Sequence, residues 1–269
     1  MNRRIVLRWM ACFAAVAVLS GCSIVPSAEE VTTDLQVSSA ETSGAAQVTP
    51  PAVEQSATGS AAVALAGLPV KGRAPKAGYA RSQFGKAWTD ENTALWGGDS
   101  LSTRENILSR DLTNVICKAK PAAPVLPPCV VQSGILTDPY TGVTLNFVRG
   151  QESSQLVPID HVVALGDAWQ KGGQQITAAE RVNLANDPLN LIATTRAPNS
   201  AKSDSDSASW LVPNWKFRCM YVARQIAVKS KYRLWVTKSE GEAMERVLAR
   251  CPGQSLPTEA EASQRTVSP

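Results

Sequence analysis

The distribution of aromatic residues marks the part of the chain that can fold. Residues 23–70 contain no Phe, Trp or Tyr and are rich in Ala, Ser, Thr, Val and Pro. Such a segment cannot bury enough apolar surface to offset the conformational entropy that folding removes. Residues 252–269 have a similar composition. The sequence therefore predicts a disordered tether at 23–70, one folded domain at 71–251 and a flexible tail at 252–269.

Residues 1–22 have the features of a bacterial export signal. Three arginines precede a short apolar run, and the run ends at Leu19-Ser20-Gly21-Cys22. This run is too short to cross a bilayer, so it indicates a cleaved signal peptide. Its end resembles a lipobox, in which the cysteine carries the lipid; a signal that merely contains a cysteine is the alternative. We expect an exported protein at the outer face of the cell membrane, held only by lipid on Cys22, or secreted.

Four cysteines remain after Cys12 leaves with the signal and Cys22 carries lipid: Cys117, Cys129, Cys219 and Cys251. An even number in an exported protein favours two disulfides. Three pairings are possible, and the most local joins Cys117 to Cys129 and Cys219 to Cys251. A four-cysteine zinc site is the alternative, but the chain has no pair with the Cys-x-x-Cys spacing.

The predicted domain is basic. Residues 71–251 contain 23 Lys and Arg against 16 Asp and Glu, a net charge of +7. Residues 216–233 contain six Lys and Arg and no acid, with two tyrosines among them. These charges favour a polyanionic partner, with Arg224 as a substrate-binding residue. A solvated helix face with aromatic core anchors is an equally good interpretation of the same segment.

Local patterns predict an α+β fold, helix-rich and with a small antiparallel sheet. Apolar residues at 130–136 and 143–148 flank a turn-rich loop and predict a β-hairpin. A short strand is expected at 157–160, followed by a helix at 162–170. Thr177 with Glu180 and Thr237 with Glu240 match the capping box that opens helices, here to about 185 and 250. A further helix is expected from 215 to about 231.

The only histidine in the sequence, His161, directly follows Asp160 at the end of an apolar run. One histidine excludes a two-histidine zinc site and a histidine phosphorelay. Imidazole has an ordinary pKa near neutrality, which suits a general base that activates water. A hard divalent ion, Mg²⁺ or Mn²⁺, prefers oxygen ligands, and Asp160 and Asn199 are the candidates. These residues indicate metal-dependent phosphodiester hydrolysis; a satisfied core histidine is the alternative.

Six groups of residues together resemble exported HNH (His-Me finger) endonucleases, of the group related to the C-terminal nuclease domain of GmrSD-type restriction enzymes. The resemblance spans roughly 75–251, and its most specific part is the Asp-His pair with the later Asn-Leu pair. The matching residues are Gly78–Gly85; Thr103–Leu108 with Arg110–Leu112; Asp138–Gly142; Ile159–Leu165 with Ala168-Trp169; Asn186–Leu191; and Asn199 with Lys202.

The resemblance implies a ββα-metal (His-Me finger) active site within the domain at 71–251. In that site His161 is the general base and Asp160 a metal ligand. Asn190 matches the middle asparagine, which holds the loop and orients the histidine. Asn199 takes a metal-ligand position that is a histidine in many HNH enzymes, and Lys202 contacts the phosphate. The acids that follow Lys202, Asp204 and Asp206, are expected in a solvated loop.

These observations lead to one hypothesis and one alternative. The hypothesis is a metal-dependent endonuclease that cleaves DNA, or RNA, with one histidine and one divalent ion. No protein partner is inferred. The alternative is a non-catalytic surface lipoprotein that binds nucleic acid or another polyanion on an HNH scaffold. The retained Asp160-His161 pair favours the enzyme, since a binding protein has no need of a general base.

Overall fold

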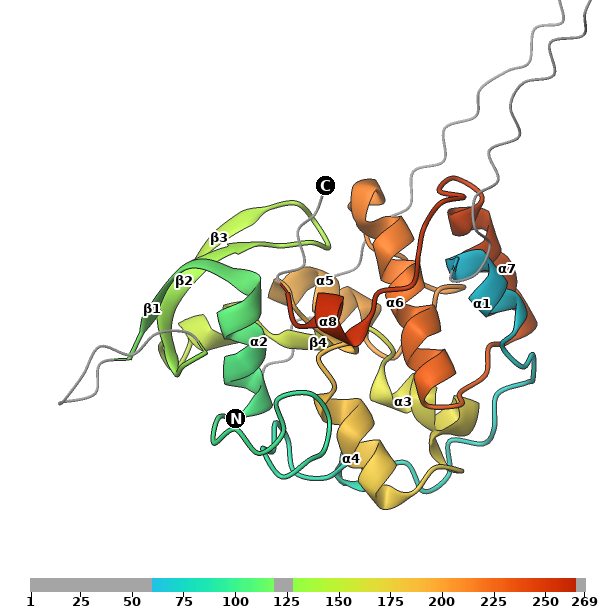
Figure 1. The fold of residues 1–269 in the computed structure, drawn as a ribbon, viewed down its shortest axis with the longest axis horizontal. Helices are drawn as coiled ribbons and strands as arrows, with labels where there is room; N and C mark the ends of the chain where they lie inside the picture. Colours follow the sequence, from blue (N-terminus) through green and yellow to red (C-terminus); the bar gives the residue numbers. More distant parts are fainter. Residues whose placement is uncertain (1–59, 119–127, 265–269) are drawn as a thin grey trace, which may run out of the picture. The chain divides into compact units, whose positions relative to one another are not determined.

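The computed structural model describes residues 60–118 and 128–264, all within one compact unit, which is an α+β domain of helices and two small antiparallel sheets (Figure 1). Residues 1–22, including Cys22, and most of the predicted tether lie outside the described residues. No helix in the described ranges is long and apolar enough to span a bilayer.

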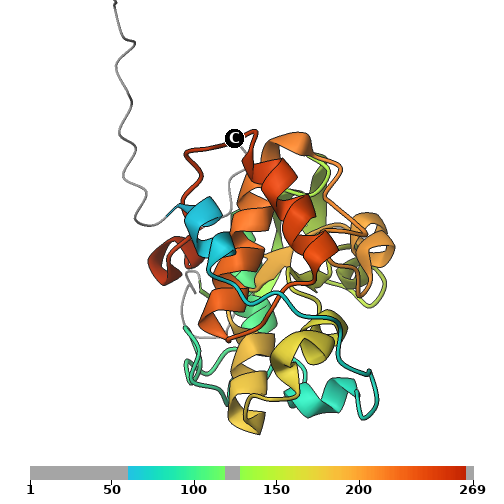
Figure 2. The same ribbon diagram turned by 90° about the vertical axis from the view of Figure 1, so that its right-hand side faces the viewer.

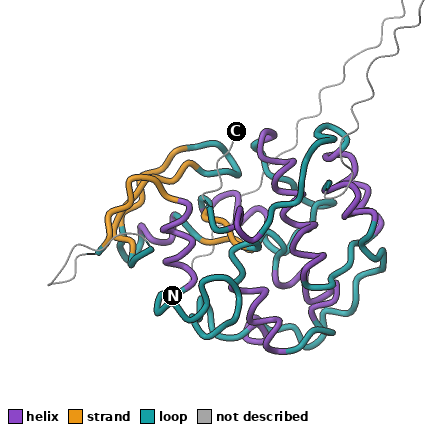
Figure 3. Tube along the Cα trace, in the orientation of Figure 1, coloured by secondary structure: helices purple, strands orange, loops and turns teal. Residues whose placement is uncertain are grey.

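The first sheet has three strands in the order β1-β2-β3, with β1 at Leu112–Cys117, β2 at Val131–Thr137 and β3 at Thr144–Val148. Figure 3 shows these strands gathered on one side, with most helices on the other. The β2–β3 hairpin confirms the predicted one, whereas β1 was not expected. Helix α2 (Thr103–Asp111) contributes Ile107 and Leu108 to the core beneath this sheet, together with Leu112 and Leu136.

The second sheet is a pair of three-residue strands, β4 (Ile159–His161) and β5 (Leu191–Ala193). Asp160 pairs with Ile192 and His161 with Leu191 in antiparallel register. Helix α5 (Arg196–Lys202) follows β5 closely. The chain thus forms a compact strand–strand–helix unit around the Asp-His pair, with the expected strand shifted by one or two residues.

Helices α1 (Ala61–Ala66), α6 (Arg218–Lys231) and α7 (Lys238–Leu248) lie side by side (Figures 1 and 2) and share one core. Helix α6 is preceded by the 3-10 turn η4 (Trp215–Phe217). Helix α8 (Glu259–Ala262) buries Ala262 in a neighbouring core. The packed region is therefore wider than the expected 71–251, because Ala61, Leu65 and Ala262 supply buried apolar side chains.

Both predicted capping boxes are present. Thr177 and Glu180 cap α4 (Ala178–Asn186), and Thr237 and Glu240 cap α7. The helix expected at 162–170 is much shorter, since α3 spans Leu165–Ala168 and continues into the π-type turn η3 (Trp169–Gly173). The remaining short elements are the 3-10 turns η1 (Arg81–Phe84) and η2 (Ser153–Leu156).

Two disulfides link Cys117 to Cys129 and Cys219 to Cys251. This is the most local of the three pairings that the sequence left open. The first bridge joins β1 to the segment just before β2. The second joins Cys219, in the first turn of α6, to Cys251, which lies three residues after the end of α7. Each bridge therefore holds the ends of two elements that pack against each other.

Candidate functional site

Asp160 lies at the centre of β4, where two donors hold its carboxylate. The Tyr140 hydroxyl donates to Oδ2 over 2.6 Å, and Lys202 Nζ donates to Oδ1 over 3.0 Å. Lys202 also donates to the backbone carbonyl of His161 over 2.8 Å, so the last residue of α5 binds two consecutive residues of β4. Burial raises the pKa of Asp160, and the charge of Lys202 and both hydrogen bonds oppose that rise.

His161, the last residue of β4, is almost fully buried, and its ring is oriented by one hydrogen bond. Nε2 lies 3.0 Å from the backbone carbonyl of Ala185, at the end of α4. A carbonyl oxygen only accepts, so Nε2 carries the proton and Nδ1 keeps its lone pair. Burial, followed by the positive charge of Arg81, lowers the pKa of His161 to about 3. The imidazole is therefore neutral at physiological pH with Nδ1 unprotonated, and a pKa this low makes Nδ1 a weaker base than a free imidazole.

Trp88 stacks on the His161 ring. The two ring centroids lie 5.5 Å apart and the planes meet at 13°. Trp88 has a backbone φ of 57°, in the left-handed region that a bulky residue rarely adopts. Such conformations persist only where the surrounding structure enforces them, and they concentrate at functional sites. Trp88 thus covers one face of the imidazole and limits its rotation.

Asn190 joins the residues after β4 to the turn before β5. Its Oδ1 accepts from the backbone N–H of Val163 over 2.8 Å, and its Nδ2 donates to the carbonyl of Leu184 over 3.1 Å. The backbone N–H of Val162 donates to the carbonyl of Asn190 over 2.7 Å. The buried Asn190 therefore fixes the two residues that directly follow His161, and its role in orienting the histidine stays a prediction.

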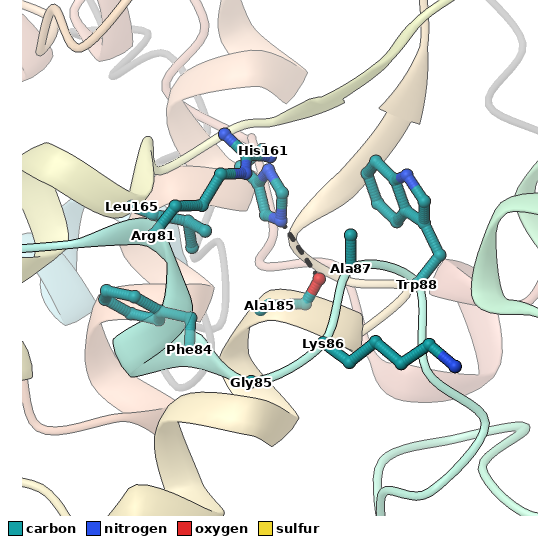
Figure 4. Close-up of a pocket in the computed structure, with 9 residues that line it drawn as sticks. All are labelled: Arg81, Phe84, Gly85, Lys86, Ala87, Trp88, His161, Leu165 and Ala185. Carbon is teal, nitrogen blue, oxygen red and sulfur yellow. Dashed lines mark hydrogen bonds between the residues drawn. The ribbon is translucent and has the colours of Figure 1, made fainter.

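A small pocket opens beside the imidazole (Figure 4). Its volume of about 30 Å³ is enough for a water molecule. The lining residues include two exposed cations, Arg81 and Lys86, and no acid. Arg81 extends beside His161 in Figure 4, whereas the Lys86 ammonium points away from it. The pocket therefore combines a neutral base, space for water and positive charge at its rim.

Two residues that the sequence assigned to substrate binding are not positioned to contact it. Lys202 is fully buried and donates hydrogen bonds to Asp160 and to the His161 carbonyl. It therefore positions these two residues and does not reach a substrate. The Arg224 guanidinium is also buried and donates to the carbonyls of Pro188 and Leu189, among others. The prediction for Arg224 overlooked that α6 packs directly against the turn before β5. Arg224 is therefore not part of the candidate site.

The residues around Asp160 offer few ligands to a hard divalent ion. Within residues 60–118 and 128–264, no three His, Cys, Asp or Glu side chains group to hold a metal. Asn199 lies three residues before Lys202 on α5, so both residues share the helix face that meets Asp160. The Asp160 oxygens accept from Tyr140 and Lys202, and the His161 backbone N–H adds a further contact. One carboxylate and one amide therefore fit a weakly bound ion, with Lys202 already neutralising part of the charge.

Several residues of the site were not identified from sequence. Asp138 and Tyr140 were predicted as part of a turn and of a segment that resembles the family, without a role in the site, yet Tyr140 donates to Asp160. The buried Asp138 accepts from Thr194 and Thr195 over 2.7 Å each, which fixes the start of α5. Arg81 lies in a segment that resembles the family but was given no role, and Trp88 carried no signal, because both reach His161 from about 75 residues earlier in the chain.

Comparison with known proteins identifies relatives of this chain. Residues 102–247, more than half of the sequence, match the family model described as GmrSD restriction endonucleases, C-terminal domain. A protein of Arthroderma benhamiae named "Uncharacterized secreted protein" is 36% identical over 205 residues, which cover 76% of this chain and 89% of the relative. No solved structure matches the chain. The chain belongs to the family of the C-terminal domain of GmrSD restriction endonucleases.

Proposed function

We propose that the protein is an HNH-type, metal-dependent endonuclease that hydrolyses phosphodiester bonds of nucleic acid, most readily DNA. Its family implies an endonuclease-like hydrolase. One observation carries the proposal: the strand–strand–helix unit of β4, β5 and α5 surrounds an imidazole whose Nδ1 is free of a proton and borders a small cationic pocket. This arrangement supports a ββα-metal (His-Me finger) site.

In the proposed reaction His161 Nδ1 accepts a proton from the attacking water. The hydrogen bond to Ala185 and the stacked Trp88 hold the ring beside the pocket and leave Nδ1 without a proton. Arg81 and Lys86 bind the substrate phosphate from the rim, where their charges attract the polyanion. Lys202 and Tyr140 hold the Asp160 carboxylate in place throughout.

A divalent ion, Mg²⁺ or Mn²⁺, held by Asp160 and Asn199 would neutralise charge on the phosphate and stabilise the leaving oxygen. Only two protein ligands are available for it, and the Lys202 ammonium lies 3.0 Å from Asp160 Oδ1. Both facts predict weak binding, with water completing the coordination. Dialysis against EDTA should therefore abolish cleavage and added Mg²⁺ or Mn²⁺ should restore it.

The main test is the His161→Ala variant of the full chain, assayed on plasmid DNA. Turnover should fall by about 10²- to 10⁴-fold, the usual contribution of a general base, while DNA binding persists. Lys238→Ala on the exposed side of α7 is the matched control and should cleave normally. Turnover of His161→Ala equal to that of this control would rule out the mechanism.

A second variant separates the metal from the base. Asp160→Asn removes the charge that the ion needs but keeps the shape of the side chain. It should raise the Mg²⁺ concentration required for half-maximal cleavage, whereas His161→Ala should lower the rate at saturating Mg²⁺. Unchanged Mg²⁺ dependence of Asp160→Asn, or full activity in EDTA, would contradict the metal site.

Export and anchoring are part of the same proposal. The Arthroderma benhamiae relative is named as secreted, and the N-terminal residues of this chain match an export signal that ends at Cys22. We propose cleavage before Cys22, lipid on that cysteine and a tether that leads to the folded domain. A Cys22→Ser form that still partitions with membranes would refute the anchor.

The alternative function is a non-catalytic surface protein that binds nucleic acid or another polyanion on the same scaffold. The two functions differ in one measurement, plasmid digestion with Mg²⁺, Mn²⁺ or EDTA. DNA binding without any metal-dependent cleavage by the wild-type chain would favour this alternative. The neutral imidazole beside a water-sized pocket favours the enzyme.

A further inference from the structure

A second cleft, which the proposed hydrolysis does not use, lies between the start of α6 and the exposed face of α7. It has a volume of about 530 Å³. We call it the basic cleft, and define it by the cations and the aromatic residue among its lining: Trp215, Lys216, Arg218, Arg246 and Arg250. The other lining residues are small or apolar, and no acid is among them.

No acid lines the basic cleft, although Glu242 and Glu245 lie near Arg246 on the exposed side of α7. The sequence has no Asp or Glu from Ser207 to Ser239, which covers one wall. In the described part of the chain, every ion pair of α7 involves Glu240 or Glu242, and none includes Arg246. Arg246 and Arg250 are exposed. Their charges are therefore available to an external anion.

The start of α6 departs from the usual charge preference of helices. The first turn of α6 contains no acid, begins with Arg218 and directly follows Lys216 in η4. Cations are unfavourable at the positive end of the helix dipole, where anions are favoured. Arg218 Nε donates to the carbonyl of Val212 over 2.8 Å, which holds its guanidinium in place. Local rules are broken in this way chiefly at functional sites.

Trp215 exposes 72% of its surface at the edge of the basic cleft. Tryptophan usually stabilises a protein by burying its large apolar ring, and a ring this exposed contributes little in that way. An indole beside cations is the arrangement that binds single strands, where bases stack on aromatic rings and phosphates contact Lys and Arg. Stacking requires an unpaired base, so the aromatic ring favours a single strand over a duplex.

The disulfide between Cys219 and Cys251 joins the two walls of the basic cleft. Cys219 lines the cleft in the first turn of α6, and Cys251 follows Arg250 after α7. Both walls therefore keep their separation without a ligand. A cleft formed in advance in this way loses little conformational entropy when a ligand binds.

We propose that the basic cleft binds a single-stranded segment of nucleic acid, with phosphates on Arg218, Arg246 and Arg250 and one base stacked on Trp215. The inference rests on the proposed function, since it gives the nuclease a second contact that retains its substrate away from the hydrolytic pocket. The affinity of the cleft does not depend on the metal, on His161 or on turnover.

The test measures binding of a short fluorescein-labelled single-stranded oligonucleotide to the full chain in EDTA, by fluorescence anisotropy. Trp215→Ala should weaken binding by about tenfold or more, the usual effect of losing one base stack. Arg246→Glu should weaken binding and reduce the slope of log affinity against log salt by about 0.7, as for one phosphate contact on a single strand. Lys238→Glu changes the same charge on the same helix and should leave both quantities unchanged.

Hydrolysis of bis(4-nitrophenyl) phosphate, which is too small to reach both sites, separates this inference from the proposed function. Trp215→Ala and Arg246→Glu should hydrolyse it at the wild-type rate. If no form of the chain hydrolyses this compound while the two variants still lose oligonucleotide binding, the proposed binding by the basic cleft is supported and the proposed hydrolase activity is contradicted. If Trp215→Ala and Arg246→Glu bind the oligonucleotide as tightly as Lys238→Glu does, the proposed binding site in the basic cleft is wrong. Trp215-dependent binding of anionic phosphatidylglycerol vesicles or heparin without any effect on the oligonucleotide would also overturn it.

Discussion

Two buried lysines, Lys171 and Lys202, occupy very different surroundings. Lys171 Nζ lies 2.7 Å from carboxylate oxygens of Asp167 and Asp206 and 2.5 Å from Glu240. Lys229 adds a second buried cation, 2.9 Å from Glu240. The exposed side is closed by Arg73, which binds Asp167 and Asp206 over 2.8 and 2.6 Å. Three cations and three carboxylates thus enclose one another; we call this the ionic cluster.

Lys202 has one carboxylate partner, Asp160, and one carbonyl partner, His161. Next to this pair lies the imidazole of His161. It borders the pocket, and its Nδ1 is unprotonated. The Lys202 pair is therefore less fully enclosed than the ionic cluster.

The difference shows what each arrangement achieves. Charges that satisfy one another on every side hold elements together: the ionic cluster joins the segment at Arg73, η3, the loop at Asp206, and helices α6 and α7. Charges at the end of a strand beside a pocket leave one group able to react. The ionic cluster should therefore govern stability, and the Lys202 pair should govern activity more than stability.

Lys171→Met should have the largest effect on stability. The variant leaves three carboxylates close together with one cation fewer, and breaking a buried pair typically costs about 3–5 kcal/mol. Chemical denaturation should show this loss, while the rate per folded molecule stays unchanged. Lys238→Met, at a lysine side chain that is 86% exposed, should change stability by less than about 0.5 kcal/mol. A loss for Lys171→Met no larger than in this control would contradict the structural role of the cluster.

Lys202→Met should cost less stability and more activity. Lys202→Met loses two charge-assisted hydrogen bonds, to one carboxylate and one carbonyl, whereas Lys171→Met loses contacts to three carboxylates. Each hydrogen bond to a charged group typically contributes about 1.5–3 kcal/mol. Without the lysine charge, burial raises the pKa of Asp160 further, so its carboxylate serves less well as a metal ligand. Cleavage at subsaturating Mg²⁺ should fall even for molecules that remain folded. If Lys202→Met loses as much stability as Lys171→Met and cleaves normally, the two buried lysines do not differ in role as proposed.

Features that depend on neighbouring residues could be predicted from sequence. The capping boxes at Thr177 and Thr237 involve residues three apart, and the β2–β3 hairpin follows from alternation around one turn. The Asp160-His161 pair was identified from the single histidine at the end of an apolar run, and Asn190 from the family resemblance. Local physics decides such features, so one sequence is enough.

Features formed by distant segments could not be predicted. Asp206 was expected in a solvated loop, and this is wrong, because Lys171 and Arg73 reach it from 35 and 133 residues away. Its neighbour Asp204 is half exposed and pairs with Lys76, as an ordinary surface ion pair. The stacking of Trp88 on His161 was also not predicted, because the two residues are far apart in the sequence. Nothing in local composition distinguishes the buried aspartate from the exposed one.

The two aspartates also provide the smallest and most specific prediction, which concerns acid stability. Burial acts to raise the pKa of Asp206, but the hydrogen bond and charge of Lys171 outweigh it, so the pKa is lowered from 3.8. A carboxyl whose pKa is lower in the folded state stabilises fully above its unfolded value. This contribution is lost as the pH falls through that value towards the folded one.

Asp206→Asn should therefore be less stable than wild type at pH 7, and the gap should narrow below about pH 4, by at most about 1.4 kcal/mol per pH unit for one proton. Asp204→Asn, two residues earlier and half exposed, should show almost no gap at either pH. Thermal unfolding of the three proteins at pH 7 and pH 3 measures both. A gap for Asp206→Asn that stays constant over this range would show that the buried carboxylate stabilises through packing alone, and the distinction between the ionic cluster and an ordinary core would be lost.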